Sequence, residues 1–440
     1  MSAARLTRRR SAELGLGILA VVIAAFGYLL VQLAQTPDVP PDLWVIFTAV
    51  LGLFVVAHFA VRRLAPDADP VLLPIAALLN GIGFVTVARL DSGLGRVQAI
   101  WTAVGVLAFV LTLFFVRRVR TLERYRYTAL FLGMGALLLP LAPGIGKTIN
   151  GARLWVGVGP VNFQPGEAAK VLLVLFFAAY LVDKRELLAS GTRRLGRLRL
   201  PEPRHLGPLL LMWAVSILIM VRETDLGQAM IIFALCGVML YVATDRGAYT
   251  LIAFVLFLGA SVIAYQLFGH VQTRVETWID PFRYANNQGY QLVQGLFGFA
   301  AGGFGGTGLG LGSPKSIPNV ATDFVFAAIG EELGLLGCVA ILIALLLFVG
   351  AGLRIAMRAD RPFPKLFATG LTTIIGLQSF VIIGGVTRTI PLTGVTLPFI
   401  SYGGSSLVAN WVILALLLRI SDDNAHGSPT RRARAAARAP

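Results

Sequence analysis

The chain has 440 residues, of which 56% are hydrophobic and only 14% are charged. Soluble proteins carry about a quarter charged residues, so this composition excludes a soluble enzyme and indicates a polytopic membrane protein. The formal net charge is +16. In a membrane protein such an excess of Lys and Arg usually lies in cytoplasmic loops, and we therefore expect no nucleic-acid partner.

Hydropathy along the chain predicts an all-α fold with about twelve transmembrane helices, since a bilayer core needs roughly 17 to 25 apolar residues per helix. The fifth, sixth and seventh candidates are short, so their ends are less sharply defined. The predicted spans are 14–34, 43–61, 70–88, 97–116, 127–142, 168–182, 207–221, 226–243, 249–268, 325–349, 366–387 and 400–420.

The distribution of Lys and Arg predicts the orientation. With the N-terminus in the cytoplasm, most of the 38 basic residues fall in cytoplasmic segments, as the positive-inside rule requires. Both termini are then cytoplasmic. The span 14–34 is too long for a signal peptide and lacks a clear cleavage site, so we expect it to be retained.

Two extracytoplasmic segments are long, about 143–167 and about 269–324. Loops of that length in a compact protein are usually functional or disordered, and both contain Trp, Phe and Val among their glycines, which argues against disorder. The Arg-rich cytoplasmic segment 183–206 is predicted to face lipid headgroups. The functional residues are therefore expected in the two outer segments.

The first outer segment contains the cations Lys147 and Arg153, and Lys170 follows it. Three cations so close together suit an anionic ligand. The alternative is an interfacial belt in which Trp155 lies at the headgroup level and the cations snorkel. Downstream, Pro165 and Glu167 predict a helix start, and Glu167 and Lys170 have the spacing of an ion pair.

The second outer segment contains a stretch with helical spacing. Tyr290, Val293, Phe297 and Ala300 predict one apolar stripe on the membrane surface, with Gln291 adding polar atoms. A glycine run, 302–312, follows. It lacks the Gly-Lys-Ser/Thr of a phosphate-binding loop, although glycines allow a backbone to approach a neighbour closely.

The stretch VATDFVFAAIGEELG, 320–334, contains three acids at the start of an apolar segment. Asp323 is a candidate for a helix N-cap, for a reactive group, or for both. Glu331 and Glu332 come roughly 12 Å deeper along a helix, where ionisable groups normally face a protein interior or a wet cavity. Helix geometry favours Glu331 for sharing a cavity with Asp323. Farther on, PLTGVTLPFISYGGSS, 391–406, is interpreted as a packing segment.

Five motifs together resemble one family: NGARLW, QPGEAAK, GYQLVQG, ATDFVFAAIGEELG and PLTGVTLPFISYGGSS occur in that order. They resemble the shape, elongation, division and sporulation proteins, the RodA/FtsW family of bacterial cell-wall polymerases, and favour its RodA branch. The resemblance covers about 70–420, a core of ten spans. Residues 1–69 are then a cytoplasmic tail with two additional transmembrane helices, and 421–440 are a basic cytoplasmic tail.

The resemblance implies a peptidoglycan glycosyltransferase. Such an enzyme polymerises lipid II at the outer face of the bacterial cytoplasmic membrane, with undecaprenyl pyrophosphate as the leaving group. The implied partners are lipid II, a class B penicillin-binding protein that crosslinks peptides, and membrane lipids. A lipid II flippase is the alternative, and a scaffold for the penicillin-binding protein is a third class. Roles in elongation, division and sporulation all stay open.

The resemblance also assigns site residues. Asp323 matches the essential Asp of the family's T-D-F motif, and we interpret it as the general base. Trp155 and Lys170 match positions that the family needs, whereas Arg153 matches less cleanly because Leu154 separates it from Trp155.

Charge on the pyrophosphate needs a counterion, and Lys147, Arg153 and Lys170 are the predicted cations. Gln291 and Glu331 complete the predicted substrate-binding residues. A divalent cation, Mg²⁺ or Mn²⁺, is an alternative source of positive charge, although the sequence assigns no metal ligands.

Overall fold

The computed structural model describes residues 3–35, 43–149, 151–158, 161–186, 193–195, 198–200, 207, 214–219, 222–223 and 225–427. These residues form a mostly helical membrane protein. In that part of the chain, nine helices are long and apolar enough to cross a bilayer. Much of the predicted span 207–221 lies outside the described residues.

The helices follow the predicted spans closely, because long apolar runs are the strongest signal in the sequence. The N-terminal helices are α1 (Ala3–Gln35), α2 (Leu43–Leu64), α3 (Leu72–Leu90), α4 (Ser92–Phe115), α5 (Arg126–Leu138) and α6 (Pro165–Asp183). The later ones are α9 (Leu226–Thr244), α10 (Gly247–Leu267), α11 (Gly269–Ile279), α12 (Tyr290–Gly302), α13 (Val325–Met357), α14 (Pro362–Val386) and α15 (Gly404–Gly427). Short 3₁₀ turns are η1 (Val119–Tyr125), η2 (Leu139–Leu141) and η3 (Pro314–Ser316).

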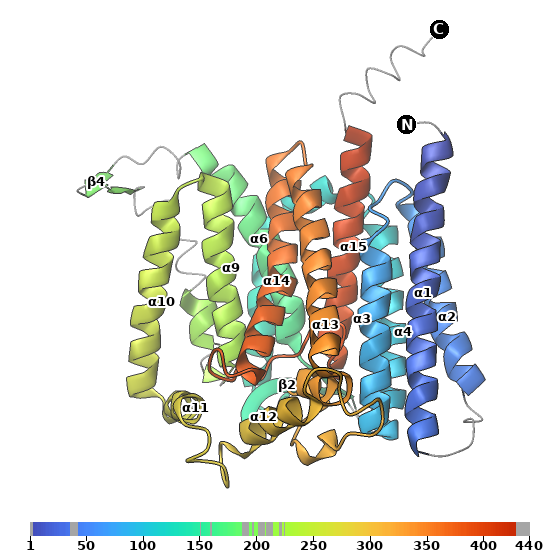
Figure 1. The fold of residues 1–440 in the computed structure, drawn as a ribbon. Coiled ribbons are helices and arrows are strands. Elements are labelled where there is room, and N and C mark those ends of the chain that lie inside the picture. Colours follow the sequence, from blue (N-terminus) through green and yellow to red (C-terminus); the bar gives the residue numbers. More distant parts are fainter. Residues whose placement is uncertain are drawn as a thin grey trace.

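The helices form one bundle in which α1 begins and α15 ends at the same end (Figure 1). Helices α11 and α12 and strand β2 lie at the opposite end, which we call the outer end. Most side chains of α6, α14 and α15 are buried, whereas few of α10 are. The core therefore runs through the centre of the bundle, and α10 presents most of its surface to lipid.

The first outer segment folds into a three-stranded antiparallel sheet, which the sequence analysis had not predicted. Its strands are β1 (Gly146–Ile149), β2 (Ala152–Val158) and β3 (Val161–Phe163), in the order β1-β2-β3. Two further strands, β4 (Arg193–Leu195) and β5 (Leu198–Leu200), pair with each other within the segment 183–206. Strands this short, in a Gly-rich and Pro-rich segment, give almost no period-two signal.

The helix predicted in the second outer segment is confirmed as α12. Its predicted apolar stripe is only partly correct, since Tyr290 and Phe297 are 41% and 53% exposed but Val293 is 3% exposed. Val293 therefore packs into the protein, and its neighbour Leu292 is also buried.

The glycine run wraps tightly around the first turns of α13. Thr307 N and Gly308 N donate to the backbone oxygens of Glu331 and Glu332, at 2.9 and 3.0 Å. A Cβ at Gly302 would collide with the carbonyl oxygen of Gly330. The run is therefore glycine-rich because its backbone packs directly against another backbone.

Candidate active site

A cavity of about 220 Å³ lies at the outer end of the bundle. Six stretches that are distant in sequence line it: the sheet β1–β2, the start of α6, the start of α9, helix α11, the segment before α13, and the segment before α15. We call it the outer cavity. Its polar lining residues are Gln164, Glu167, Asp225, Gln228, Arg274, Asn319, Thr322, Asp323, Thr393, Thr396, Tyr402, Ser405 and Ser406.

Asp323 is half-buried in the wall of this cavity, immediately before α13. The N-cap of α13 is Phe324, and among the described residues no side chain caps that helix start. The N-cap alternative for Asp323 is therefore wrong. Burial raises the pKa of the Asp323 carboxyl to about 6, while a hydrogen bond from Thr322 and the positive charge of Arg274 act in the opposite direction. The carboxyl is thus mostly ionised at neutral pH.

Arg274, on α11, brings a positive charge to the same cavity. Its Nη1 donates hydrogen bonds to the carbonyl oxygens of Leu392 and Thr393, at 3.2 and 2.9 Å. These bonds fix the guanidinium group against the segment before α15. Arg274 is not among the predicted site residues, and its signal in the sequence is only that of an arginine within an amphipathic outer segment.

Asp225 is the second carboxylate of the cavity wall. It is the N-cap of α9, and its Oδ1 accepts a hydrogen bond from Gln228 N at 3.0 Å. Burial raises the pKa of Asp225 to about 6. The positive charge of Arg274 lowers the pKa of Asp225 and of Asp323 alike, so one cation serves two carboxylates.

Glu167 joins the cavity to a buried polar network. The predicted ion pair with Lys170 is confirmed, with Nζ lying 3.0 and 3.1 Å from the two carboxylate oxygens. Lys170 Nζ also donates to Gln378 Oε1 at 2.9 Å, and Gln228 Nε2 donates to Glu167 Oε1 at 2.6 Å. Lys170 is 1% exposed, so its ammonium group is enclosed behind Glu167.

The segment 391–406 is more than the packing segment that its sequence suggested. Ser405 Oγ accepts a hydrogen bond from Gln164 N at 2.8 Å, which ties this segment to the start of α6. Gly394 has φ +75°, and a Cβ there would lie 3.7 Å from Asp323 Oδ2. Small residues and hydroxyls therefore line the side of the cavity that faces the Asp323 carboxylate.

Residues 73–426 match the model of a family of cell cycle proteins that takes its name from FtsW, RodA and SpoVE. The chain belongs to this FtsW/RodA/SpoVE family. It is 45% identical over 427 residues to the peptidoglycan glycosyltransferase RodA of Mycobacterium tuberculosis, covering 94% of this chain and 91% of that one. It is 34% identical over 388 residues to a probable peptidoglycan glycosyltransferase FtsW of Nitrosococcus halophilus, covering 85% and 97%.

Solved structures support the same assignment. One, from work on the structural coordination of polymerization and crosslinking by a peptidoglycan synthase complex, superposes with a TM-score of 0.67 at 28% identity. It covers 81% of this chain and 98% of that one. The rod shape determining protein RodA of Thermus thermophilus superposes with a TM-score of 0.55 at 27% identity, covering 81% and 97%.

Three of the predicted substrate-binding residues lie in the first outer segment of this family member: Lys147, Arg153 and Trp155. Among the residues that the structure describes, Trp155 is the one of these three that lines the outer cavity. Lys147 stands opposite Trp155 in the sheet, and its Nζ donates to Asn162 Oδ1 at 3.3 Å. Arg153 donates to the carbonyl oxygens of Pro140 and Ala142, at 2.9 and 3.0 Å. Arg153 thus holds the sheet against η2, and its predicted part in substrate binding stays a prediction.

Neither Gln291 nor Glu331 is among the described residues that line the outer cavity. Each is held by a hydrogen bond elsewhere. Gln291 Nε2 donates to the carbonyl oxygen of Pro318 at 2.8 Å. Glu331 Oε1 accepts a hydrogen bond from Ser313 N at 2.6 Å. The prediction that Glu331 shares a cavity with Asp323 rests on one helix over 323–331, whereas α13 begins only at Val325.

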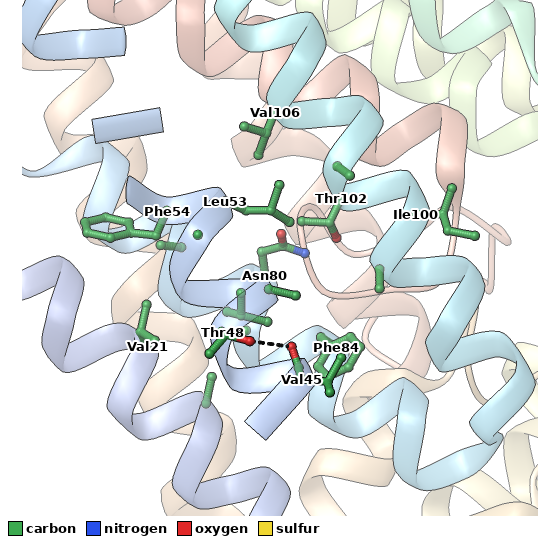
Figure 2. Close-up of a pocket in the computed structure, with 18 of the residues that line it drawn as sticks. Val21, Val45, Thr48, Leu53, Phe54, Asn80, Phe84, Ile100, Thr102 and Val106 are labelled. Atoms are coloured by element: carbon green, nitrogen blue, oxygen red, sulfur yellow. Dashed lines mark hydrogen bonds between the residues drawn. The ribbon is translucent and has the colours of Figure 1, made fainter. Parts of the chain in front are cut away.

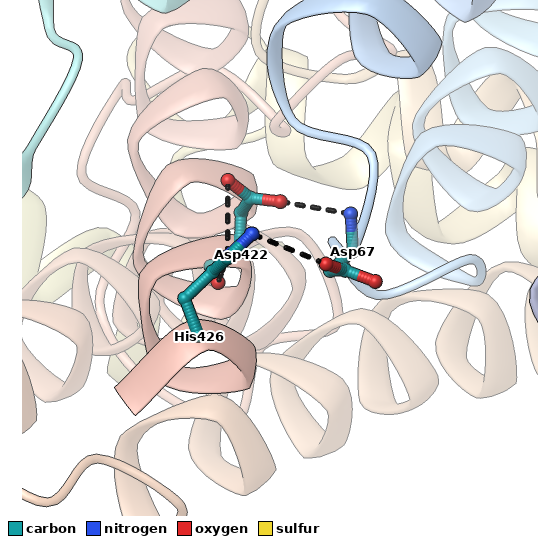
Figure 3. A group of neighbouring side chains, drawn as sticks. All are labelled: Asp67, Asp422 and His426. Carbon is teal, nitrogen blue, oxygen red and sulfur yellow. Dashed lines mark hydrogen bonds and ion pairs between the residues drawn. The ribbon is translucent and has the colours of Figure 1, made fainter. Parts of the chain in front are cut away.

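In the described part of this family member, side chains that could ligate a metal ion cluster outside the outer cavity. Asp67, Asp422 and His426 are the one group of three candidate ligands found there (Figure 3). Asp422 and His426 belong to the last turns of α15, at the end of the bundle opposite the outer end (Figure 1). Arg419 Nη1 already contacts Asp422 Oδ2 at 3.3 Å. Three carboxylates line the outer cavity, and Glu167 is already paired with Lys170, which leaves Asp225 and Asp323. That set suits Mg²⁺ carried in by phosphate oxygens better than a metal ion held by protein ligands alone.

Proposed function

We propose that this chain is a peptidoglycan glycosyltransferase that polymerises lipid II at the outer face of the cytoplasmic membrane. Membership of the family and the names of its relatives support the activity. The observation that carries the proposal is the environment of Asp323. It is an ionisable carboxylate in a cavity, it has a pKa of about 6, and a fixed arginine lies nearby.

The reaction joins an acceptor sugar oxygen to the anomeric carbon of the donor. The bond between that carbon and the pyrophosphate oxygen breaks, and the pyrophosphate leaves with the electron pair. Asp323 takes the proton from the acceptor hydroxyl as the new bond forms. A base with a pKa slightly below the working pH is suited to this step, because it is ionised and still accepts a proton.

Arg274 is the group that we assign to the leaving pyrophosphate. Its backbone hydrogen bonds orient it before substrate arrives, and a preorganised cation stabilises developing charge without reorganisation. Lys147 and Arg153 lie on the adjacent sheet and would act at longer range. Lys170 has a different role, since it neutralises Glu167 in the buried network and keeps the cavity wall in place.

A divalent cation is the second part of the proposal. Mg²⁺ usually keeps several waters and binds through one or two carboxylates together with substrate phosphates. Asp225 is the carboxylate that we assign to it, because its Oδ2 has only a long contact of 3.5 Å with Gln164 Nε2. When bound, the cation would neutralise charge on the pyrophosphate.

The flippase alternative is less well supported. Transporters commonly place their binding groups near the bilayer midplane on broken helices. Here the polar groups of the outer cavity lie at helix starts and in loops at one end of the bundle. This arrangement suits chemistry on a headgroup that has already reached the outer face.

A class B penicillin-binding protein is the proposed partner. The solved structure with the TM-score of 0.67 comes from a peptidoglycan synthase complex that couples polymerization with crosslinking. We extend that association to this chain as a proposal. Co-purification with a transpeptidase from the same cell tests it, and a chain that purifies alone under conditions that preserve such complexes would contradict it.

The activity is tested with purified protein and lipid II. We expect Asp323→Ala to lose about 10² to 10⁴ of the polymerisation rate, the usual contribution of a general base. Asp280→Ala, which removes an exposed acid elsewhere on the outer segment, is the matched control and should retain activity. Normal polymer from folded Asp323→Ala would sink the base assignment. Lipid II translocation without polymerisation by the wild type would instead favour the flippase.

A further inference from the structure

A second and larger cavity, of about 640 Å³, lies among α1, α2, α3 and α4 (Figure 2). We call it the lateral cavity. Within the described residues, none that lines it also lines the outer cavity. Helices α1 and α2 precede the region that matches the family model, which begins at residue 73. The lateral cavity is therefore built partly from the additional helices of this chain.

The wall of the lateral cavity is almost entirely hydrocarbon. Phe54, Phe84 and Val106 are typical of its lining (Figure 2). Its two hydroxyl groups are turned to backbone: Thr48 Oγ1 donates to the Val45 carbonyl oxygen at 3.0 Å, and Thr102 Oγ1 donates to a carbonyl of its own helix at 2.9 Å. Two further polar side chains line it, Asn80, whose Nδ2 donates to the Phe399 carbonyl oxygen at 3.4 Å, and Trp411. Most of the wall therefore offers water no hydrogen-bond partner.

The cavity opens sideways toward the bilayer. Val45 on α2 and Ile100 on α4 both line it, yet they are 68% and 62% exposed. Side chains that both line a cavity and face outward mark its mouth. In a membrane the surroundings of that mouth are acyl chains, and the volume lies in the range of small-molecule binding sites, about 300–1,000 Å³.

Among the described residues that line the lateral cavity, one is a cation, and it lies at the rim. Arg96 lies in the second turn of α4 at the outer end of the bundle, lines the cavity and is exposed. Among the described residues it makes no ion pair, and the neighbouring Asp91 caps α4 by accepting from Leu94 N at 2.9 Å. A basic side chain at this depth commonly reaches the headgroup region and attracts anionic lipid.

We propose that the lateral cavity binds one anionic phospholipid of the outer leaflet. One acyl chain enters between α2 and α4 and fills the apolar space, and the headgroup phosphate pairs with Arg96. Charge complementarity at the rim distinguishes this occupant from a transmembrane helix of a partner protein. The absence of shared lining with the outer cavity, over the described residues, distinguishes it from the polyprenyl chain of the enzyme's substrate.

The test is native mass spectrometry of the full chain, released from detergent after exposure to phosphatidylglycerol or phosphatidylcholine. Gly52→Leu is the filling variant, because Gly52 lines the cavity and a Cβ there meets no atom within 4 Å. Gly259→Leu on the lipid-facing helix α10 is its matched control, since that glycine also has open space around it. Arg96→Gln removes the charge, with Lys315→Gln as the control for an exposed outer cation.

We expect the wild type to retain one phosphatidylglycerol in preference to phosphatidylcholine. Arg96→Gln should weaken phosphatidylglycerol binding about fivefold, and Gly52→Leu should abolish the retained lipid. Both controls should bind as the wild type does. Equal retention by Gly52→Leu and wild type would overturn the proposal. So would equal binding of the two lipids by the wild type, or recovery of a polyprenyl lipid or a partner helix at this position.

Discussion

Asp323, Glu331 and Glu332 lie within one stretch of fifteen residues, yet the surroundings of their carboxylates differ. Asp323 lies in a cavity wall and does not cap α13. Glu332 accepts from Arg89 Nε and from Gly310 N, both at 3.1 Å, and Glu331 accepts from Ser313 N. The carboxylates deeper in α13 are bound by fixed donors, and the one outside the helix faces open space.

This difference separates a reactive acid from structural ones. A carboxylate whose oxygens are occupied by backbone and guanidinium donors anchors a loop, and it has little freedom to accept a substrate proton. Glu331 and Glu332 hold the glycine run against α13, which in turn positions the segment leading to Asp323. The carboxylates of Glu331 and Glu332 therefore stabilise the fold, whereas the carboxylate of Asp323, by our proposal, takes part in the reaction.

The largest effect is expected from removing the ion pair between Arg89 and Glu332. Arg89 is 10% exposed and Glu332 is 6% exposed at their side chains, so Arg89→Ala leaves a buried carboxylate without its cation. Removing one partner of a buried ion pair lowers the free energy of unfolding by about 3–5 kcal/mol. Thermal unfolding in detergent should show a much lower midpoint, and Arg89→Lys should recover part of it. An unchanged midpoint for Arg89→Ala would show that the glycine run holds without this ion pair.

The next effect concerns the cation beside Asp323. We expect Arg274→Gln to lower the maximal polymerisation rate about 100-fold, as the loss of one preorganised donor does. In the wild type, activity should fall as the pH drops through about 6, because Asp323 must be deprotonated to act. Arg274 lowers the pKa of Asp323, so its removal should move that acidic limb to higher pH. A limb that stays in place would separate Arg274 from Asp323.

A smaller effect is expected from crowding Asp323. Gly394 has a positive φ and faces the carboxylate, and a side chain in that conformation costs about 1–2 kcal/mol. Gly394→Ala should reduce polymerisation several-fold. Gly144→Ala is the control, since Gly144 has φ +79° and no atom within 4 Å of its Cβ position. If both variants lose the same activity, backbone strain alone explains the loss.

The smallest effect is expected at the sheet. Lys147 is exposed, and its Nζ has one long contact with Asn162. Exposed pairs contribute up to about 1 kcal/mol, so Lys147→Gln should change polymerisation less than about fivefold. Steady-state rates over a range of lipid II concentrations measure this. A loss comparable to that of Arg274→Gln would restore Lys147 to the pyrophosphate site.

The sequence predicted the elements that carry strong local signals. Long apolar runs marked the helices, and Pro165 and Glu167 marked the start of α6. The pairing of Glu167 with Lys170 followed from their spacing in one helix. Asp323 was found because an acid in such an apolar stretch is conspicuous, and because a family motif contains it.

Features that depend on distant contacts could not be predicted in the same way. Arg274 and Asp225 reach the outer cavity only because α11, the start of α9 and the segment before α15 converge there. The partner of Glu332 is Arg89, which is 243 residues away in sequence. Single-sequence patterns describe one element at a time, so contacts between elements stay outside their reach.

The most direct test of the account compares the two ends of the stretch with isosteric substitutions in one assay. Asp323→Asn and Glu331→Gln should be purified in parallel, matched for folded protein, and given lipid II. The account predicts that Asp323→Asn makes almost no polymer, whereas Glu331→Gln, which keeps an oxygen to accept from Ser313 N, polymerises at close to the wild-type rate. Polymer from Asp323→Asn together with loss of activity in Glu331→Gln would contradict it.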